Sequence, residues 1–554
     1  MQGLMQDTPL TLPVVFRRAE RFFGDKTIVT AGRKPPEGPA PTSRSTYRTW
    51  AERTRRLGGV LDQLGVSEDG RVATFAWNST RHLELYFAAP CTGRVLHTLN
   101  IRLFAEQLTY IVNHAEDEVI FVDRSLIGAL WRLVPTFTTV RHFVVMDDIG
   151  GAGPELPEDP RLLDYEELVA KADPVEFTVS DENRAAAMCY TSGTTGNPKG
   201  VVYSHRSSVL HSIGAMLADS VAVSERDVVL PVVPMFHANA WGLAHAAAFA
   251  GASLVFPGPD MTPAAIADLI ERERVTLAAG VPTIWMGMLP LLDGRDLSAL
   301  DRIVCGGSAV PKALSEGYKT KTGKPIMHAW GMTETSPLGS VCRQRSTFDA
   351  LTEEELIEHR ASQGIASPLV DMRVVDPDTL EELPWDGKAS GEIQVQGPWV
   401  ARGYYNDPRS QESFTADGWL RTGDVGTLSP EGYINLVDRT KDLIKSGGEW
   451  ISSVALENEI MAHPAVAEAA VIAIDDERWG ERPLACVVVK TGEALTEAEL
   501  LDWLRPKVAS WWVPEGVVFI DEVPKTSVGK FSKKTLRDRF AGYQPAAHPP
   551  ASGG

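Results

Sequence analysis

Cysteine is scarce in this sequence, with five among 554 residues. The cysteines are widely spaced, and no two form the pair, separated by two residues, that is typical of zinc sites and redox motifs. This distribution excludes a disulfide framework and a cysteine-based zinc site. It predicts buried thiols in a reducing compartment, and therefore a cytoplasmic protein. The five are Cys91, Cys189, Cys305, Cys342 and Cys486.

Positive charge is also in short supply. The chain has 54 lysines and arginines against 73 aspartates and glutamates, which gives a net charge of −19. A charge of this sign repels nucleic acids and anionic membrane surfaces. Neither is therefore expected as a principal partner.

Two further absences bear on targeting and membranes. Residues 1–16 contain no lysine or arginine, so we expect no signal peptide. Residues 228–259 contain no charged side chain of Asp, Glu, Lys or Arg, a run long enough to suggest a membrane span. Because Pro231, Pro234 and Pro257 interrupt this run, a buried strand, turn, helix and strand explain it better, and no membrane span is expected.

The length and the hydrophobic pattern predict the domain organisation. A chain of 554 residues is too long for one core, so we expect two or more domains. Helical and strand patterns alternate over residues 47–146, which is typical of an α/β architecture with largely parallel sheets. From about residue 370, short strands and turns indicate an antiparallel or barrel-like subdomain. A second α/β unit begins near Asp438, and in it Thr496 and Glu499 form a capping-box pattern that opens a helix.

Residues 190–200 are the most informative stretch. Two short apolar segments, predicted to be strands, flank a run with three glycines, four Ser or Thr hydroxyls and Lys199. Glycines allow backbone N–H groups to turn towards a ligand, and such a concave row of donors attracts phosphate. The alternative is a hairpin turn, but hairpins use about two to five turn residues. The Walker pattern does not fit, because Gly200 follows Lys199 where Ser or Thr is required.

This stretch resembles the phosphate loop of the adenylate-forming enzymes, the superfamily of acyl-CoA synthetases, adenylation domains and luciferases. The family motif, approximately Ser/Thr-Ser/Thr-Gly-Ser/Thr-Thr-Gly-x-Pro-Lys-Gly, matches at every position. The family's other motifs follow in order and at similar spacing, and the resemblance covers roughly residues 10–540. These matches are CGGSA at 305–309, HAWGMTET at 328–335, RTGD at 421–424, DRTKDLIKSGGEW at 438–450 and PKTSVGK at 524–530.

The resemblance implies an α/β fold with two domains. The large N-terminal domain, residues 1–437, would contain two α/β sheets and a barrel-like β subdomain. The small α+β C-terminal domain, residues 438–544, would be mobile. The tail 545–554 is rich in Pro, Ala and Gly and is expected to be disordered.

The resemblance also implies a nucleotide site. The adenine would lie against the 305–309 turn and the aromatic of the 328–335 motif, Asp424 and Arg439 would hold the ribose, and Glu334 and Thr191 would bind Mg²⁺. Trp330 stands where the family usually has Tyr, which preserves stacking but removes a phenol hydroxyl. A Gly-Gly turn and a Thr-Glu pair are also common as ordinary turns. The residues implied in ATP or AMP binding are Thr191, Ser192, Gly193, Thr194, Thr195, Gly196, Gly307, Ser308, Ala309, His328, Ala329, Trp330, Gly331, Thr333, Asp424, Arg439, Lys441 and Lys445.

Catalysis is implied for Lys530, Thr333, Lys199 and His237. Lys530 would neutralise the charge that builds on the reacting carboxylate and α-phosphate. The alternative for Lys530 is a surface lysine in a basic patch.

Lys441 matches the family's hinge position, about which the small domain rotates. The rotation would bring the coenzyme A loop, Gly447, Gly448, Glu449 and Trp450, to the site. The alternative is that this segment is only a charged linker.

The acid that is activated is less clear from the sequence. His237 takes the place of the Asp that amino-acid-activating relatives use to pair the substrate ammonium, so an amino acid substrate would leave a buried charge unpaired. Gly280 and Gly331 offer small walls for an alkyl chain. The segment around Trp241 resembles that of bacterial medium- to long-chain fatty acyl-CoA synthetases, where a Trp gates the acyl tunnel, although Trp241 can also be read as a core aromatic.

We therefore expect an AMP-forming acid–thiol ligase that uses ATP, Mg²⁺ and coenzyme A, most similar to the long-chain fatty acid–CoA ligases. A fatty acid would become acyl-AMP with release of pyrophosphate, and coenzyme A would then displace AMP. The alternatives are a coenzyme A ligase for an aromatic or short-chain acid, a fatty acyl-AMP ligase that loads a carrier protein, and a non-enzymatic acyl-binding protein with a relict site. Relatives of this group form dimers, so a homodimer is possible.

Overall fold

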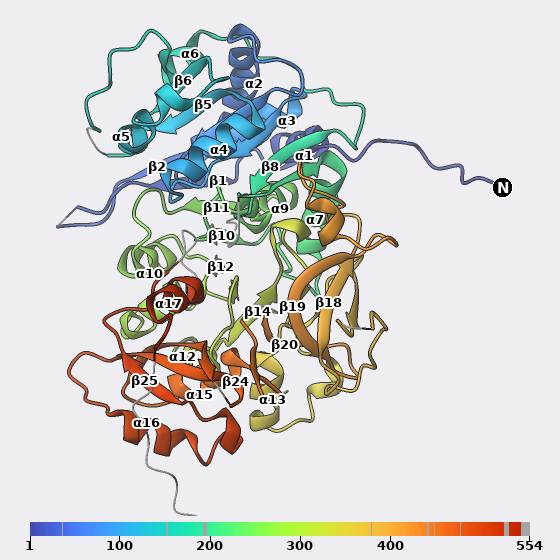
Figure 1. Ribbon diagram of the computed structural model, residues 1–554. Coiled ribbons are helices and arrows are strands. Elements are labelled where there is room, and N and C mark those ends of the chain that lie inside the picture. The colour runs from blue at the N-terminus through green and yellow to red at the C-terminus, as the bar shows by residue number, and fades with distance from the viewer. Residues whose placement is uncertain are drawn as a thin grey trace, which may run out of the picture.

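A computed structural model describes most of the chain: residues 1–35, 37–150, 153–191, 197–377, 379–439, 442–447, 449–476, 478–525 and 531–543. The predicted tail 545–554 lies outside these residues. Four sheets form the framework (Figure 1). Residues 27–366 contribute the strands of two sheets, the third sheet follows them in sequence, and the fourth lies in the C-terminal part.

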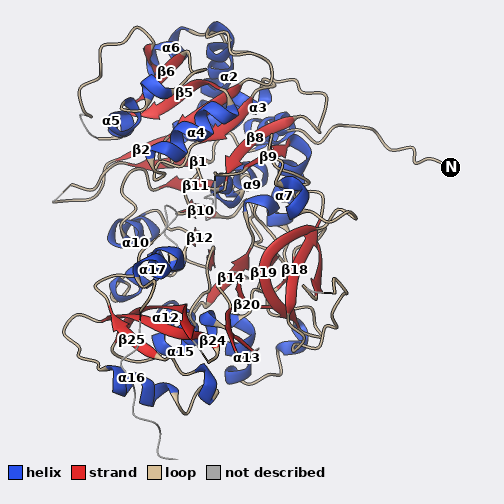
Figure 2. Ribbon diagram, in the orientation of Figure 1, coloured by secondary structure: helices blue, strands red, loops and turns tan. Residues whose placement is uncertain are grey.

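The first sheet has seven strands in the order β7-β6-β5-β3-β4-β8-β9. All neighbours are parallel except β8 and β9, which form an antiparallel hairpin. Helices cover its faces, as expected for a parallel sheet (Figure 2). Its strands are β3 (Arg71–Phe75), β4 (Val95–Thr98), β5 (Asp117–Asp123), β6 (His142–Met146), β7 (Leu162–Asp164), β8 (Ala185–Tyr190) and β9 (Gly200–Ser204); its helices are α2 (Tyr47–Gln63), α3 (Thr80–Cys91), α4 (Ala105–Ala115), α5 (Ile127–Trp131), α6 (Tyr165–Lys171) and α7 (His205–Met216).

The second sheet has nine strands in the order β16-β15-β14-β13-β12-β10-β11-β1-β2. It is parallel from β1 to β14 and antiparallel at both edges. Its strands are β1 (Thr27–Ala31), β2 (Thr42–Thr46), β10 (Val228–Pro231), β11 (Ser253–Phe256), β12 (Leu277–Gly280), β13 (Arg302–Gly306), β14 (Ile326–Trp330), β15 (Ser340–Val341) and β16 (Ile365–Ala366); its helices are α1 (Leu12–Phe22), α8 (Ala238–Trp241), α9 (Leu243–Ala250), α10 (Pro263–Arg272), α11 (Pro282–Met288) and α12 (Lys312–Thr322).

One apolar core joins these two sheets. Phe16 of α1, Val72 of β3 and Leu254 of β11 are fully buried in the same cluster. The uncharged run 228–259 forms β10, α8, α9 and β11, in agreement with the strand, turn, helix and strand predicted for it. Among the described residues, no helix combines the length and apolar character that crossing a bilayer requires.

The third sheet is antiparallel, in the order β17-β18-β19-β20. Its strand β20 pairs with β19 as far as Arg439, just past the domain boundary predicted at residue 437. Where the two domains divide therefore stays a prediction. The elements are β17 (Asp371–Val375), β18 (Gly391–Gln396), β19 (Leu420–Leu428) and β20 (Ile434–Arg439), with helices α13 (Glu353–Ala361) and α14 (Ser410–Ser413).

The C-terminal part has its own sheet and core. The strands follow the order β22-β21-β24-β23, and β25 adds to β24 in parallel. The capping box of Thr496 and Glu499 forms as predicted. The elements are β21 (Ile444–Ser446), β22 (Glu449–Ile451), β23 (Val466–Asp476), β24 (Gly480–Val489), β25 (Gly516–Phe519), α15 (Ser453–Met461), α16 (Glu497–Leu504) and α17 (Lys533–Arg539). Short 3-10 turns lie at Arg124–Leu126, Val134–Thr136, Leu289–Leu291, Thr333–Thr335, Ser346–Phe348 and Ser510–Trp512.

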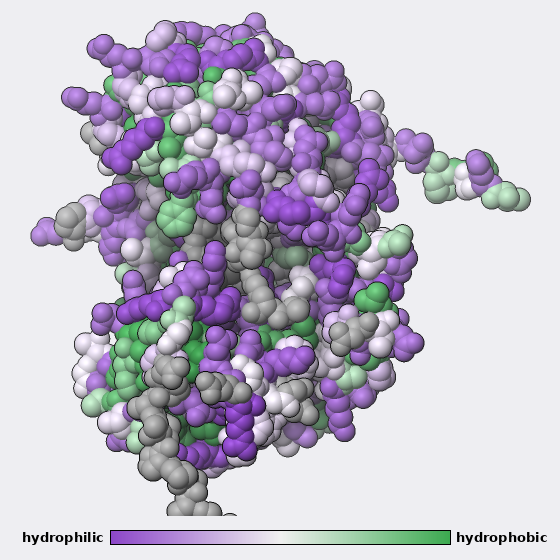
Figure 3. Space-filling view, viewed as in Figure 1, coloured by the Kyte–Doolittle hydropathy of each residue, from purple (hydrophilic) through white to green (hydrophobic). Residues whose placement is uncertain are grey.

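The fold class predicted from the sequence is confirmed. The mixed and parallel sheets come first, the antiparallel sheet follows, and a smaller α+β unit ends the chain. All five cysteines are unpaired thiols, and four of them are buried, which agrees with the distribution in the sequence. The face shown in Figure 3 is largely hydrophilic, as the charge content requires.

Candidate functional site

Three of the predicted site segments lie where parallel strands of the nine-stranded sheet end. The 305–309 segment begins within β13, and the 328–335 motif begins within the neighbouring strand β14. Gly280 ends β12, on the other side of β13. Ligands in open α/β sheets bind at the carboxyl ends of strands. The position therefore suits a nucleotide site.

The phosphate loop is closed at its base by two hydrogen bonds. The backbone N–H of Thr191 donates to the carbonyl oxygen of Lys199 at 2.9 Å. In return, the N–H of Lys199 donates to Oγ1 of Thr191 at 3.2 Å. The loop joins an antiparallel hairpin, with Tyr190 opposite Gly200, but residues 191–199 exceed the length of a hairpin turn. The predicted phosphate-binding residues Ser192, Gly193, Thr194, Thr195 and Gly196 lie outside the described residues.

Lys199 is held beside the loop by two side chains from a distant segment. Its Nζ donates to Oγ of Ser413 at 3.2 Å. The same nitrogen lies 4.4 Å from the ring centre of Tyr404, within the range of a cation–π contact. These two contacts therefore fix the direction in which the ammonium group of Lys199 points.

Thr333 and Glu334 form a short 3-10 turn after β14 and are both buried. The hydroxyl of Tyr203 donates to the carbonyl oxygen of Thr333 at 2.8 Å. The hydroxyl of Tyr404 donates to Oε1 of Glu334 at 2.7 Å. Burial raises the pKa of the Glu334 carboxyl, and the Tyr404 hydrogen bond and the charge of Lys199 act in the opposite direction. The turn thus holds the buried carboxylate of Glu334. Its ionised form accepts a hydrogen bond from the neutral hydroxyl of Tyr404 and lies near the positive charge of Lys199.

One carboxylate is enough for the metal that the sequence predicts. Mg²⁺ in nucleotide sites is bound through one or two carboxylates together with phosphate oxygens and water. Glu334 offers such an oxygen, and Thr191 stands at the base of the phosphate loop. The described part of the chain holds no group of three His, Cys, Asp or Glu side chains arranged to bind a metal ion.

The adenine side of the predicted site is formed by residues 306–309 and by His328. Gly307 adopts a left-handed φ of 85°, and Ser308 is exposed. His328 is buried, its Nδ1 lies 3.3 Å from the carbonyl oxygen of Ala361, and burial lowers its pKa to about 4. His328 is thus a neutral side chain behind the turn, with the half-buried Ala329 next to it on β14.

Trp330 makes a polar contact that the sequence did not suggest. Its Nε1–H donates to Oδ2 of Asp424 at 2.8 Å, and the indole is buried in the core of the antiparallel sheet. Nε of Arg439 lies 3.2 Å from the other oxygen, Oδ1, of Asp424. Asp424 and Arg439 also face each other across β19 and β20. The two predicted ribose residues are therefore brought together, and Trp330 orients one of them.

Two glycines assigned to the acyl pocket are required by packing. A methyl group on Gly331 would overlap the carbonyl oxygen of Pro337. A methyl group on Gly280 would come within 2.8 Å of the Trp285 ring, which fills the space on that side. Both positions therefore have a steric reason to be glycine, and their role towards an acyl chain stays a prediction.

The turn that carries Trp241 has an unusual backbone. Ala238, Asn239, Ala240 and Trp241 have φ values of 43°, 54°, 53° and 56°. The left-handed conformation costs about 1–2 kcal/mol for each such residue. The thiol of Cys189, at the end of β8, donates to Oδ1 of Asn239 at 3.3 Å and ties the turn to the strand that leads into the phosphate loop.

Trp241 is half-buried, and a methyl group on Gly306 would lie 3.4 Å from its ring. His237 is also half-buried and directly precedes the left-handed turn. The Trp241 ring thus stands beside the 305–309 turn, and the role of His237 stays a prediction.

Several predicted residues of the C-terminal part lie elsewhere or outside the described residues. Lys441, Gly448 and Lys530 are outside them, as is the side chain of Glu449. Gly447 is exposed, has a φ of 62°, and donates its N–H to the carbonyl oxygen of Trp479. Trp450 is 47% exposed, and Nζ of Lys445 lies 5.3 Å from its ring centre. Lys445 thus contacts the predicted coenzyme A loop, and its role in nucleotide binding stays a prediction.

The sequence did not single out residues 397–419, the connection between β18 and β19. This connection contains Tyr404, which contacts both Lys199 and Glu334, and Ser413, which accepts a hydrogen bond from Lys199. Two signals pointed there: connections of this length are uncommon and usually functional, and an aromatic and arginine run, Trp399-Val400-Ala401-Arg402-Gly403-Tyr404-Tyr405, lies within it.

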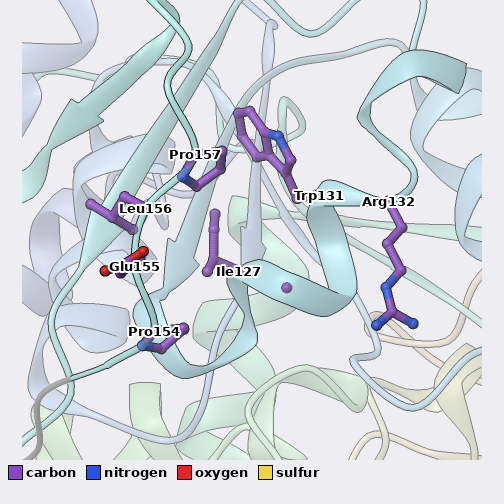
Figure 4. Close-up of a pocket in the computed structure, with 8 residues that line it drawn as sticks. Ile127, Trp131, Arg132, Pro154, Glu155, Leu156 and Pro157 are labelled. Atoms are coloured by element: carbon purple, nitrogen blue, oxygen red, sulfur yellow. The ribbon is translucent and has the colours of Figure 1, made fainter.

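A pocket of about 440 Å³ lies away from these residues. It is formed between α5, which contributes Ile127 and Trp131, and the segment 154–157 (Figure 4). None of its lining residues belongs to the predicted site.

Comparison with known proteins identifies the family. A 3-methylmercaptopropionyl-CoA ligase of Ruegeria lacuscaerulensis is 44% identical over 98% of this chain and 99% of its own length. A long-chain-fatty-acid–CoA ligase of Thermus thermophilus is 46% identical over 97% of both chains. The ATP-bound structure of MatB from Rhodopseudomonas palustris superposes with a TM-score of 0.81 at 28% identity, over 96% of this chain and 99% of that one. With the AMP-binding enzyme model matching residues 15–405 and the model of its C-terminal domain matching 455–530, the chain belongs to the AMP-binding enzyme family.

Proposed function

We propose that the chain is an AMP-forming acid–coenzyme A ligase whose acid is a medium- to long-chain fatty acid. Acid–coenzyme A ligation is supported by the two full-length relatives, both named as ligases of this kind. The observation that carries the proposal is the convergence of Glu334 and Lys199 beside the phosphate loop, with Asp424 and Arg439 paired nearby. ATP, Mg²⁺ and coenzyme A are the cofactor and co-substrates of such enzymes.

In the first proposed step the fatty carboxylate attacks the α-phosphate of ATP, and the bond to pyrophosphate breaks. Lys199, Thr333 and Lys530 would stabilise the charge that develops on the phosphate oxygens. Glu334 and Thr191 would hold Mg²⁺, which offsets phosphate charge when bound. His237 would lie beside the reacting carboxylate.

In the second proposed step the coenzyme A thiol attacks the acyl carbon, its proton passes to solvent, and AMP leaves. The small domain would rotate about Lys441, withdraw Lys530 and present residues 447–450. The adenylate is already an activated anhydride, so the chain needs no nucleophilic side chain of its own.

The chain length of the acid is the least constrained part of the proposal. Trp241 beside Gly306 supports a gate between the nucleotide and the acyl pocket, with Gly280 and Gly331 as its small walls. The relatives act on acids as different as 3-methylmercaptopropionate and long-chain fatty acids at nearly equal identity to this chain. A ligase for a short acid is therefore the second candidate.

The experiment that tests the proposal is AMP release with straight-chain acids from C4 to C18, 3-methylmercaptopropionate and benzoate, with and without coenzyme A. We expect a maximum between C8 and C16 and turnover only with coenzyme A. A maximum with a short acid or benzoate would contradict the chain-length proposal alone. Adenylate formation to which coenzyme A adds nothing would favour loading of a carrier protein.

We further propose a cytoplasmic enzyme, which the buried unpaired thiols support. A homodimer stays a prediction, for which light scattering of the purified protein gives the test.

Removal of the Asp424 carboxylate is expected to weaken ATP binding. Asp424→Ala leaves the indole N–H of Trp330 and the guanidinium of Arg439 without their shared acceptor and removes the proposed ribose contact. We expect the KM for ATP to rise about 30-fold, equivalent to about 2 kcal/mol. Steady-state kinetics measure it, with Asp417→Ala, which removes an exposed carboxylate paired with Arg373, as the control. An unchanged KM would remove Asp424 from the ribose site.

A further inference from the structure

The connection 397–419 reaches both halves of the proposed site. The N–H of Ala401 donates to the carbonyl oxygen of Glu334 at 2.7 Å. Nη2 of Arg409 donates to the carbonyl oxygen of Asn197, within the phosphate loop, at 3.0 Å. Oγ of Ser336 donates to the carbonyl oxygen of Trp399 at 2.7 Å, just after the 333–335 turn. This connection therefore bridges the phosphate loop and the turn that carries the buried carboxylate.

Tyr404 is the residue of this connection that touches both charged groups. Its hydroxyl donates to Oε1 of Glu334 at 2.7 Å, and the face of its ring receives Nζ of Lys199 at 4.4 Å. Its own backbone is fixed, since its N–H donates to Oγ of Ser410 at 2.8 Å. The two contacts come from different parts of one rigid ring, so a shift of Tyr404 would move both partners.

The chemistry of the two contacts is complementary. A phenol donates a hydrogen bond to a carboxylate without neutralising it, so Glu334 keeps the charge that a divalent cation requires. The π face attracts an ammonium without taking its proton, so Lys199 keeps its charge for phosphate. A carboxylate or an ammonium in place of Tyr404 would repel one partner.

We propose that Tyr404 is a positioning residue for the adenylation step: its hydroxyl fixes the rotation of Glu334 for the cation of Mg·ATP, and its ring fixes the ammonium group of Lys199 for the phosphates of ATP. This inference rests on the proposed function. Tyr404 acts through these two groups and does not itself contact the reacting atoms.

The test separates the hydroxyl from the ring. Calorimetry measures the Kd of ATP with Mg²⁺ and with EDTA for the wild type, Tyr404→Phe and Tyr404→Leu. Tyr404→Phe keeps the ring, so we expect metal-free ATP to bind as in the wild type while the gain in affinity from Mg²⁺ shrinks about tenfold. Tyr404→Leu also removes the ring, and metal-free binding is expected to weaken about fivefold.

The matched control is Tyr405→Phe, which removes a neighbouring hydroxyl from a ring that lies beside His114. It is expected to keep the wild-type ratio of the two Kd values. A double-mutant cycle with Glu334→Gln completes the test. Once the carboxylate is gone, adding Tyr404→Phe should not change the ratio of the two Kd values any further.

The outcomes are distinct. The positioning role is overturned if Tyr404→Phe keeps the wild-type ratio of the two Kd values. It is also overturned if Tyr404→Phe lowers this ratio in the Glu334→Gln background as well. A lowered melting temperature with an unchanged ratio also overturns it, because packing alone would then explain the residue. If wild-type protein binds ATP but forms no adenylate with any acid, the proposed function fails and this inference fails with it.

Discussion

Replacing Glu334 by glutamine is expected to slow adenylate formation about 100- to 1000-fold, the loss typical when one group that stabilises a transition state is removed. Glutamine has the same shape and can still accept the hydrogen bond from Tyr404, but it carries no charge. Because Glu334 is buried, solvent cannot replace the missing charge. Exchange of radioactive pyrophosphate into ATP measures this step directly.

The control for this variant is Glu392→Gln. Glu392 is also buried and pairs with Arg421 on the antiparallel sheet, so it tests the loss of a buried acid outside the proposed catalytic group. Acyl transfer from synthetic acyl-adenylate to coenzyme A should be much less affected in Glu334→Gln. If both half-reactions fell equally, Glu334 would have a structural role instead of one in adenylation.

Replacing Gly331 by alanine is expected to destabilise the protein by about 3–5 kcal/mol. The added methyl group would occupy the position of the Pro337 carbonyl oxygen, and a backbone atom cannot move aside as a flexible side chain can. The strand end at Trp330 and the turn at Thr333 would be displaced together, so adenylation should be lost as well. Thermal unfolding followed by calorimetry measures the change.

Gly128→Ala provides the comparison. Gly128 lies in α5, and a methyl group there meets no atom within 4 Å. Alanine favours a helix over glycine, so this variant should match or exceed the stability of the wild type. A Gly331→Ala protein with wild-type stability would mean that the Pro337 backbone can move.

The family, the fold class and the order of the elements were predictable from the sequence because their signals are local. The capping box of Thr496 and Glu499, for example, needs only residues three positions apart. The contacts of Trp330 with Asp424 and of Tyr404 with Glu334 join positions 94 and 70 residues apart. Neither periodicity nor a motif carries that information, so the sequence predicted Trp330 as an aromatic and did not predict Tyr404.

The left-handed backbone of the turn 238–241 was not predicted, for a different reason. Ala238, Ala240 and Trp241 have no intrinsic preference for the left-handed region, and alanine favours the right-handed helix. The contacts around the turn, including that of Asn239 with Cys189, override the local preference. A conformation that the neighbouring structure imposes cannot be read from the segment alone.

The pairing of Asp424 with Arg439 has a consequence for the order of events. Both residues belong to β19 and β20, so both precede the proposed pivot at residue 441 in the chain. A ribose held there would keep its place while the C-terminal part changes partners around it. The adenosine moiety would then keep one position through both proposed steps: it would arrive with ATP, stay while pyrophosphate departs, and leave as AMP once the acyl group has passed to coenzyme A.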